Sequence, residues 1–277
     1  MLLDSHQHFW KYHPKTHSWI TDEMFTIRKD FLPKHLAPVL KENKVDGCIL
    51  VQSEQTEGAT QQLIDWAQKN PFVKGIVGWV NLLDEKSLVS CLEKYKQYSI
   101  VKGFRHILQA EATDFLLDKN FKKGIELLGT YNYTFDLLIR EEQLPNAISL
   151  VAQLPQQSFV LDHLAKPSIS NGVSSDWEKY IRELAKYPNV YAKLSGMVTE
   201  TSYYIWNKED FKAFLDIMVD SFGVNRLMFG SDWPVCLVAA DYKEVLGLIT
   251  DYFSFFSTND YFKVMGLNAT HFYNIQT

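Results

Sequence analysis

The sequence predicts an α/β protein of the (β/α)8 type, a TIM barrel formed by one domain over residues 1–277. Short apolar runs rich in β-branched residues alternate with longer amphipathic stretches, and about eight such repeats follow one another. A chain of 277 residues with 46% hydrophobic residues is long enough for this fold, which typically takes about 250 residues. A doubly wound open sheet is the alternative, but no G-x-G-x-x-G segment follows the first apolar run.

The expected strands are residues 2–8, 45–52, 73–82, 101–108, 133–140, 158–165, 190–196 and 226–234. Helical patterns lie between them, as in residues 60–70, where Leu63, Ile64 and Ala67 share one face. Residues 141–154, 176–187 and 208–223 show the same periodicity. Strands that alternate with helices imply a parallel sheet with right-handed crossovers.

Charge and cysteine content narrow the class of protein. The formal net charge is -5 and no basic run occurs, so nucleic acid is not expected as a partner. The N-terminus lacks the features of a secretory signal, and no apolar run approaches the roughly 20 residues of a membrane span. Three widely spaced cysteines argue against a disulfide framework. A cytoplasmic protein is therefore expected, with the cysteines in its core.

In a barrel of this type, the chemistry lies where the strands end. The first apolar run ends in Asp4, His6 and His8, at alternate positions that share one face of a strand. Two imidazoles on one face suit a metal ion or a site that needs several polarising hydrogen-bond donors. A surface strand with two exposed histidines is the alternative interpretation.

The other expected strands also end in polar or aromatic residues: Gln52, Glu54, Trp79, Asn81, Arg105, His106, Arg140, Asp162, His163, Lys166, Lys193, Ser195, Asp232 and Trp233. Four of the eight histidines fall at such ends. A structural role is favoured for Arg140 as a helix cap or surface residue, and for Lys193 as half of an ion pair. Asp162 should face away from its neighbour His163 in a regular strand. A structural role is also expected for the histidines outside the strand ends: His13, His17, His35 and His271.

Asp232 lies in the segment SDWP, at the end of the last apolar run, where Pro234 ends strand pairing. An acidic side chain held at the barrel mouth beside apolar groups suits a general base, because partial burial raises its proton affinity. The sequence thus points to Asp232 as the base of the site.

Eight segments in order are similar to the amidohydrolase superfamily: DSHQHFW, GCILVQSEQ, GIVGWVNL, KGFRHILQ, FVLDHLAKP, KLSGMVTE, RLMFGSDWPVC and NATHFY. They span nearly the whole chain. The chain most resembles the amidohydrolase-related (amidohydrolase 2) branch. That branch contains sugar-lactone and aromatic-lactone hydrolases, including enzymes of the L-fuconolactonase and L-rhamnonolactonase kind.

This resemblance implies metal-ligand positions at His6 and His8 on strand one, His163 on strand six and Asp232 on strand eight. The chain departs from metal-rich members in two ways. Strand five has no histidine, and Lys102 comes too early in strand four to act as a bridging ligand. A binuclear site is therefore not expected. Two possibilities stay open: one divalent ion, Zn or Mn, held by His6, His8 and Asp232 with His163 as a further ligand, or a metal-free site.

The implied reaction is hydrolysis of a lactone, with Asp232 as general base and His6, His8 and His163 polarising the carbonyl. The expected substrate-binding residues are Arg105, His106, Gln52, Glu54, Lys166, Trp10 and Trp233. Only one arginine is expected at the mouth, which favours a neutral sugar-acid lactone, an aldono-1,4- or 1,5-lactone, over a poly-carboxylated one.

Three alternatives remain at this stage. The first is a zinc-dependent decarboxylase of an unsaturated or aromatic acid. The second is a hydrolase of a carboxylated pyrone or muconolactone. The third is a binding or structural protein that has kept the barrel and lost the chemistry, although the expected ligand and base positions are all chemically competent. No membrane partner is expected, and the sequence allows a monomer or a homodimer.

Overall fold

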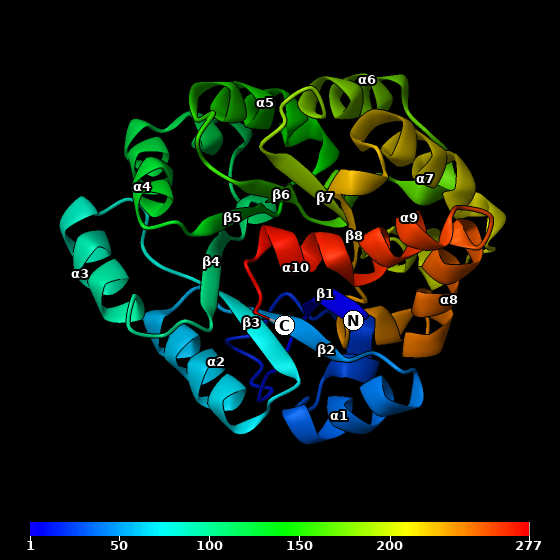
Figure 1. Ribbon diagram of the computed structural model, residues 1–277, viewed down its shortest axis with the longest axis horizontal. Coiled ribbons are helices and arrows are strands. Elements are labelled where there is room, and N and C mark those ends of the chain that lie inside the picture. Colours follow the sequence, from blue (N-terminus) through cyan, green and yellow to red (C-terminus); the bar gives the residue numbers. More distant parts are fainter. Residues whose placement is uncertain (277) are drawn as a thin grey trace.

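The computed structural model describes residues 1–276, and its centre is a ring of eight parallel strands in sequence order (Figure 1). The strands are β1 (Leu3–Gln7), β2 (Gly47–Val51), β3 (Val73–Gly78), β4 (Val101–His106), β5 (Thr134–Leu137), β6 (Phe159–Leu161), β7 (Val190–Leu194) and β8 (Leu227–Phe229). Each strand pairs in parallel with the next one along the chain, from β1 to β8. The predicted (β/α)8 barrel is confirmed.

Ten α-helices accompany the ring in residues 1–276; most surround its outer side, and the last lies across one end of it (Figure 1). They are α1 (Pro33–Glu42), α2 (Glu57–Lys69), α3 (Glu85–Tyr95), α4 (Lys119–Thr130), α5 (Leu144–Gln153), α6 (Ser175–Leu184), α7 (Glu209–Phe222), α8 (Tyr242–Phe253), α9 (Thr258–Phe262) and α10 (Asn268–Phe272). The four helical patterns read from the sequence correspond to α2, α5, α6 and α7, and Leu63, Ile64 and Ala67 are buried as expected. None of the helices in residues 1–276 combines the length and the apolar character that a membrane span requires.

Two apolar layers stabilise the barrel. The larger layer lies between strands and helices, and it contains Cys48, Cys91 and Cys236 as free, buried thiols. The smaller layer fills the inside of the ring and extends to Ala269 and Tyr273 at the C-terminal end of the chain. In Figure 1, α10 lies across the end of the barrel that faces the viewer. This end is closed by apolar packing.

The strands end earlier than the sequence predicted. The runs 158–165 and 226–234, for example, contain strands of only three residues each, β6 and β8. The remaining residues of these runs leave the sheet and form turns at the barrel mouth. Polar residues expected at strand ends therefore lie mostly in the first turn after a strand, which is where side chains can converge over the barrel axis.

The seam between β8 and β1 is closed by two backbone hydrogen bonds at the barrel mouth. The Asp232 N–H donates to the His6 carbonyl oxygen at 2.8 Å, and the His8 N–H donates to the Trp233 carbonyl oxygen at 2.7 Å. Segments more than 220 residues apart in the chain thus meet at a fixed register. This pairing places the last strand's acid beside the first strand's histidines.

Candidate active site

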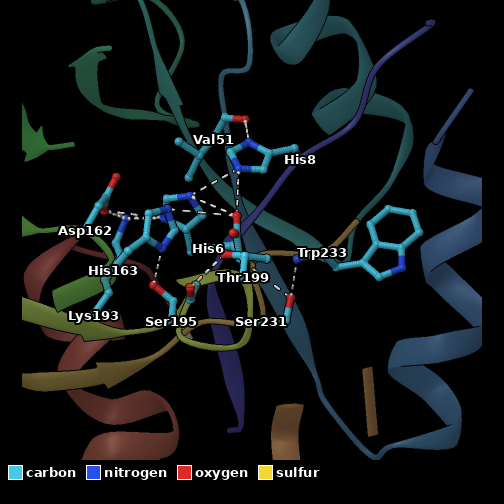
Figure 2. A network of polar contacts seen from close by, with 12 residues as sticks. His6, His8, Val51, Asp162, His163, Lys193, Ser195, Thr199, Ser231 and Trp233 are labelled. Atoms are coloured by element: carbon cyan, nitrogen blue, oxygen red, sulfur yellow. Dashed lines mark hydrogen bonds and ion pairs between the residues drawn. The ribbon is translucent and has the colours of Figure 1, made fainter. Parts of the chain in front are cut away.

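Four side chains converge at the seam, and Figure 2 labels three of them, His6, His8 and His163. His8 Nε2 lies 3.2 Å from His6 Nε2 and 3.2 Å from Asp232 Oδ1. His6 Nε2 lies 3.8 Å from the same carboxylate oxygen, and His163 Nε2 lies 4.0 Å from it. All four side chains are buried to at least nine-tenths. The structure therefore brings together the four residues expected to form the centre.

Asp4 does not join this group, although its spacing predicted a shared face with His6 and His8. The register of β1 against β2 shifts between Asp4 and Gln7. The Asp4 carboxylate instead accepts hydrogen bonds from the Ser231 hydroxyl at 2.6 Å and from Tyr242 of α8 at 3.1 Å. A local irregularity breaks the two-residue period, so this part of the prediction is wrong.

The Nδ1 atom of each histidine has a fixed neighbour. His8 Nδ1 lies 2.8 Å from the Val51 carbonyl oxygen, His163 Nδ1 lies 2.9 Å from Ser195 Oγ, and His6 Nδ1 lies 3.4 Å from Asp162 Oδ1. A carbonyl oxygen only accepts, so His8 carries its proton on Nδ1. These contacts orient the rings so that the Nε2 atoms point to the common centre (Figure 2).

His163 is held by a left-handed turn. Residues His163 to Lys166 all have φ between +53° and +61°, a conformation that costs a non-glycine residue about 1 kcal/mol or more. Asp232 also has a positive φ, of +56°. Gly196, at φ +65°, lies against the ring, because a Cβ there would come within 2.5 Å of His163 Nδ1. Two of the four residues that form the centre, His163 and Asp232, thus have the left-handed backbone conformation.

Asp162 also points into the barrel, contrary to the expectation that it faces away from His163. β6 ends at Leu161, so the alternation of strand faces no longer applies. Asp162 Oδ2 accepts a hydrogen bond from Arg105 NH1 at 3.1 Å, and Asp162 Oδ1 lies 3.0 Å from Lys193 Nζ. Lys193 also pairs with Asp136 of β5. The predicted ion pair of Lys193 is confirmed, with two partners instead of one.

Burial and charge set the protonation of the centre. Burial holds the pKa of His6 well below its usual range, and it lowers the pKa of His163 to about 4, so both rings are neutral at pH 7. For Asp232, burial acts to raise the pKa, but the adjacent histidines outweigh it and hold the pKa well below the usual range. The expectation of a raised proton affinity for Asp232 is therefore wrong. It is an ionised carboxylate.

The donor set suits one divalent cation. Because His8 directs its Nδ1 proton to the Val51 carbonyl oxygen, its Nε2 atom faces the ionised Asp232 carboxylate, 3.2 Å away. Imidazole nitrogens and a carboxylate oxygen that face one point form a set of ligands for a cation. His6, His8 and Asp232 offer ligand atoms within 4.8 Å of one another, and a mixed imidazole and carboxylate set is typical of zinc and manganese sites.

A second group of possible ligand atoms, from His6, Asp162 and His163, also lies within 4.8 Å. Its carboxylate is already bound by two cations of the protein, Lys193 and Arg105. An additional metal ion would therefore be repelled at this position. The geometry agrees with the expectation of a mononuclear centre.

A cavity of about 490 Å³ opens above the centre. His8, His163 and Asp232 form part of its wall. Around them lie Trp19, Met24, Ser53, Gln55, Arg105, Ile107, Gln109, Ala110, Leu138, Arg140, Lys166, Thr199, Glu200, Tyr204 and Val235. Its size and its mixture of apolar and polar groups are typical of a site for a small molecule.

Two of the predicted substrate-binding residues line this cavity, Arg105 and Lys166. Arg105 is 4% exposed, and its Nε atom has no hydrogen-bond partner among the described residues. Lys166 forms an ion pair with Glu200 at the rim. Both are therefore placed to meet a bound molecule.

The two tryptophans predicted to bind substrate are structural. Trp10 is 1% exposed, packs on Phe31 and donates from its indole to the Lys29 carbonyl oxygen at 2.9 Å. Trp233 packs edge-on against Phe31 and is turned away from the histidines in Figure 2. Both rings pack against Phe31, in the long loop after β1. Their assignment to substrate binding is wrong.

Three further predicted residues lie outside the cavity wall. Gln52 is fully buried and donates to the Arg105 carbonyl oxygen at 3.1 Å. Glu54 faces His17, with 3.4 Å between Oε1 and Nε2. His106 lies 2.9 Å from Glu111 and stacks on Phe115. Each side chain is engaged by a neighbour of its own, so the prediction of a direct substrate contact is not supported by their positions.

Several residues of the site were missed. Arg140 lines the cavity, which corrects the expectation of a single arginine at the mouth. It also precedes a short helical turn, where its N–H donates to Gln143 Oε1, so the predicted capping position is correct. Asp136 was missed although it is an isolated acid in the apolar run YTFDLLI, and a buried acid requires a partner. Lys193 on β7 is that partner.

Comparison with known proteins gives a consistent family assignment. The family model described as amidohydrolase matches residues 3–275. An L-fucono-1,5-lactonase of Burkholderia multivorans is 36% identical over 263 residues, covering 90% of this chain and 87% of the relative. An L-fucono-1,5-lactonase of Burkholderia ambifaria is 33% identical over 280 residues, covering 99% and 95%. The crystal structure of an amidohydrolase from Burkholderia multivorans with bound zinc superposes with a TM-score of 0.96 at 34% identity, over 100% of both chains.

Proposed function

The chain belongs to the amidohydrolase family, and from this premise we propose that it is a hydrolase that opens the ring of a sugar-acid lactone. The observation that carries the proposal is the convergence of His6, His8 and Asp232 on one point in the cavity wall. The lactonase relatives, 33% and 36% identical, support the same reaction class.

His6, His8 and Asp232 would hold one divalent ion, with His163 as a further ligand. We favour zinc, because the related amidohydrolase structure contains it. When bound, such an ion supplies a Lewis acid for the lactone carbonyl and for water. The chain's own contribution is to orient the three imidazole rings, whose Nδ1 atoms lie beside the Val51 carbonyl oxygen, Ser195 Oγ and Asp162 Oδ1.

Asp232 is the proposed general base. Its Oδ1 atom makes the contacts with the histidines, which leaves Oδ2 available for proton transfer. The carboxylate takes a proton from the attacking water, and the water oxygen bonds to the lactone carbonyl carbon. When the ring C–O bond breaks, the same proton passes from Asp232 to the leaving oxygen, so that the product is a hydroxy acid.

Arg105 lines the cavity and is placed to stabilise the oxyanion or to bind a substrate oxygen through its guanidinium group. Arg140, Gln109 and the Lys166–Glu200 pair provide donors and acceptors around the cavity for hydroxyl groups. We propose an aldono-1,5-lactone of a deoxy sugar, of which L-fucono-1,5-lactone is one, as the substrate. A carbohydrate-metabolic role follows from this assignment.

The alternative of a zinc-dependent decarboxylase is less well supported. The position on β5 where a further histidine was sought carries Asp136, whose carboxylate is bound to Lys193 and to Tyr273. A carboxylated lactone deserves a direct comparison, because Arg105 and Arg140 both line the cavity.

The test is a rate measurement on three substrate classes. Hydrolysis of aldono-1,5-lactones, aldono-1,4-lactones and a carboxylated pyrone is followed with a pH indicator, and carbon dioxide release is followed from a dihydroxybenzoate. We expect the aldonolactones to react fastest with the untreated protein. Chelation should remove this activity, and returning zinc to the chelated protein should restore it. Faster turnover of the pyrone, or carbon dioxide release, would assign the site to the corresponding alternative.

We also propose that residues 1–277 act as one domain in a reducing compartment, the cytoplasm, as a monomer or a homodimer without nucleic acid. Three buried free thiols and the net charge of -5 support these assignments. Size-exclusion chromatography with light scattering measures the oligomeric state directly.

A further inference from the structure

Four charged residues form a closed cluster beneath His6. Arg105 of β4, Asp136 of β5, Asp162 after β6 and Lys193 of β7 are at most 4% exposed. Asp162 binds both cations, with 3.1 Å to Arg105 NH1 and 3.0 Å to Lys193 Nζ. Two positive and two negative side chains balance one another, which a buried cluster requires. The proposed hydrolysis gives a role to Arg105 of this cluster but to none of Asp136, Asp162 and Lys193.

Among residues 1–276, the hydrogen bonds and ion pairs that join the cluster to the centre all involve His6, and the Asp162 carboxylate also lies within 4.8 Å of a His163 ring nitrogen. Asp162 Oδ1 lies 3.4 Å from His6 Nδ1, and Arg105 NH1 lies 3.2 Å from His6 Nε2. An arginine only donates, so this second contact requires a lone pair on Nε2. A neutral His6 then carries its proton on Nδ1, facing Asp162 Oδ1 at 3.4 Å, an oxygen that has no hydrogen-bond partner among the described residues. Both contacts select the tautomer that a metal ligand needs.

Lys193 acts in the opposite direction on His6. Its ammonium lies 3.2 Å from His6 Nδ1 and would favour a lone pair there. It is restrained by two carboxylates, Asp136 and Asp162, and Asp136 also accepts a hydrogen bond from the Tyr273 hydroxyl at 3.0 Å. The tautomer of His6 therefore depends on which neighbour interacts more strongly with Nδ1. The Asp162 carboxylate favours a proton on Nδ1, and the Lys193 ammonium favours a lone pair there.

We propose that Asp162 is a positioning residue, which fixes His6 with its proton on Nδ1 and its Nε2 lone pair directed at the metal centre. Lys193 and Arg105 hold the carboxylate in place. The consequence for catalysis rests on the proposed function, but the positioning itself does not. It gives a role to a residue that the sequence predicted only to face away from His163.

Two charge-balanced double variants separate this role from general support of the fold. Asp162→Leu/Lys193→Met removes one negative and one positive charge together with the acceptor for His6. Asp136→Asn/Lys193→Met removes the same charges, keeps Asp162 with Arg105, and leaves an oxygen for Tyr273. Both variants lose Lys193, so they differ in which carboxylate remains. Far-UV circular dichroism and thermal unfolding establish that each is folded.

The first readout is the zinc dissociation constant, measured by competition with a chelating dye. Loss of an outer-sphere partner of a metal-bound histidine typically weakens binding about 10–100-fold, so we expect that change in the Asp162 variant and less than about a threefold change in the Asp136 variant. Equal weakening in both variants would overturn the proposal.

The second readout is spectroscopic and uses zinc-free protein labelled with ¹⁵N-histidine. The signals of His6 are identified by their loss in His6→Gln. We expect the Nδ1–H tautomer in the wild type and in the Asp136 variant, and the Nε2–H tautomer or a mixture in the Asp162 variant. A His6 that keeps the Nδ1–H tautomer without Asp162 would overturn the proposal.

These readouts do not depend on lactone turnover. A wild-type protein that hydrolyses none of the lactones would refute the proposed function, while the zinc and tautomer measurements would still decide the role of Asp162. If leucine at position 162 prevents folding, Asp162→Ala/Lys193→Met removes the same acceptor with less bulk and is judged by the same outcomes.

Discussion

At the scale of single residues, Asp232 is the proposed general base, and its ionised form is stabilised by the adjacent histidines. The histidines that lower its pKa make it a weaker base than burial alone would. They also ensure that it is ionised, and therefore able to accept a proton, at neutral pH. For the proposed role as a base, the position of this carboxylate beside the histidines is therefore more important than a raised pKa.

Asp232→Asn removes the proton acceptor while keeping the side-chain volume. We expect kcat to fall about 10²–10⁴-fold, the range typical of a lost general base. The measurement is kcat with a sugar-acid lactone at equal zinc content, which separates lost base catalysis from lost metal. Unchanged kcat at equal zinc content would remove Asp232 from the proposed role.

Arg140 offers the cleaner test of substrate binding. Arg105 is tied to Asp162 and to the Gln52 backbone, so its removal also disturbs the charged cluster. Arg140 is exposed, and its side chain makes only a long contact of 3.4 Å to the Gln109 carbonyl oxygen. We expect Arg140→Met to raise KM about tenfold with kcat nearly unchanged, as for a group that binds substrate and transition state alike.

Arg182 on α6 is the matched control for Arg140. It pairs with Glu178 on the outer surface and does not line the cavity. Arg182→Met should leave both constants unchanged. If Arg140→Met behaves in the same way, Arg140 does not contact the substrate.

The residues that the sequence located correctly share one property. His6, His8, His163 and Asp232 are polar side chains at the ends of apolar runs, and the barrel fold alone brings such ends together. Trp10 could not be placed in this way, because an aromatic ring gains from burial wherever a neighbouring loop provides apolar surface. The packing of a loop leaves no periodic pattern of apolar residues in the sequence, unlike a helix or a strand.

At the scale of elements, the end of β7 and the turn after β6 act as one unit. Gly196 follows β7 and leaves room for the His163 ring, which the left-handed turn presents. The strand β6 itself was predictable from its apolar run. The left-handed turn was not, because its four residues include no glycine to mark a positive φ.

Gly196→Ala should displace His163, because its Cβ would lie 2.5 Å from Nδ1. The positive φ adds a backbone cost of about 1–2 kcal/mol. We expect a lower free energy of unfolding in denaturant titration and a loss of kcat of at least about tenfold, since a small displacement of a catalytic group is costly.

Gly172→Ala is the control for the backbone term. Gly172 has φ +74°, and an added Cβ would meet nothing within 4 Å. It should lose a similar free energy of unfolding and keep full activity. Equal activity of the two alanine variants would show that His163 tolerates the added methyl group and that the close approach has no catalytic consequence.

At the scale of the whole molecule, the candidate metal centre lies on the seam that closes the barrel. His6 lies in β1 and His8 directly after it, and Asp232 lies in the turn after β8. An ion bound to these three residues would therefore link the first and last strands of the sheet. The closed ring was predictable from eight alternating repeats. The seam geometry was not, because it depends on the irregularity in β1.

Zinc should therefore stabilise the fold as well as the site. At a free concentration of 100 times the dissociation constant, binding to the native state alone adds about 2.7 kcal/mol, which corresponds to a rise in Tm of about 5–10 °C for a chain of this size. Differential scanning calorimetry of chelated and zinc-loaded protein measures the shift. His8→Gln should abolish most of it, and an undiminished shift in that variant would place the ion elsewhere.

The central claim is that this cluster opens the ring of a sugar-acid lactone. The most direct test is hydrolysis of a panel of aldonolactones by the wild-type protein, with metal content read by elemental analysis on the same sample. The account predicts turnover of an aldono-1,5-lactone with about one divalent ion per chain. Protein that carries the ion and leaves every aldonolactone in the panel intact would contradict it.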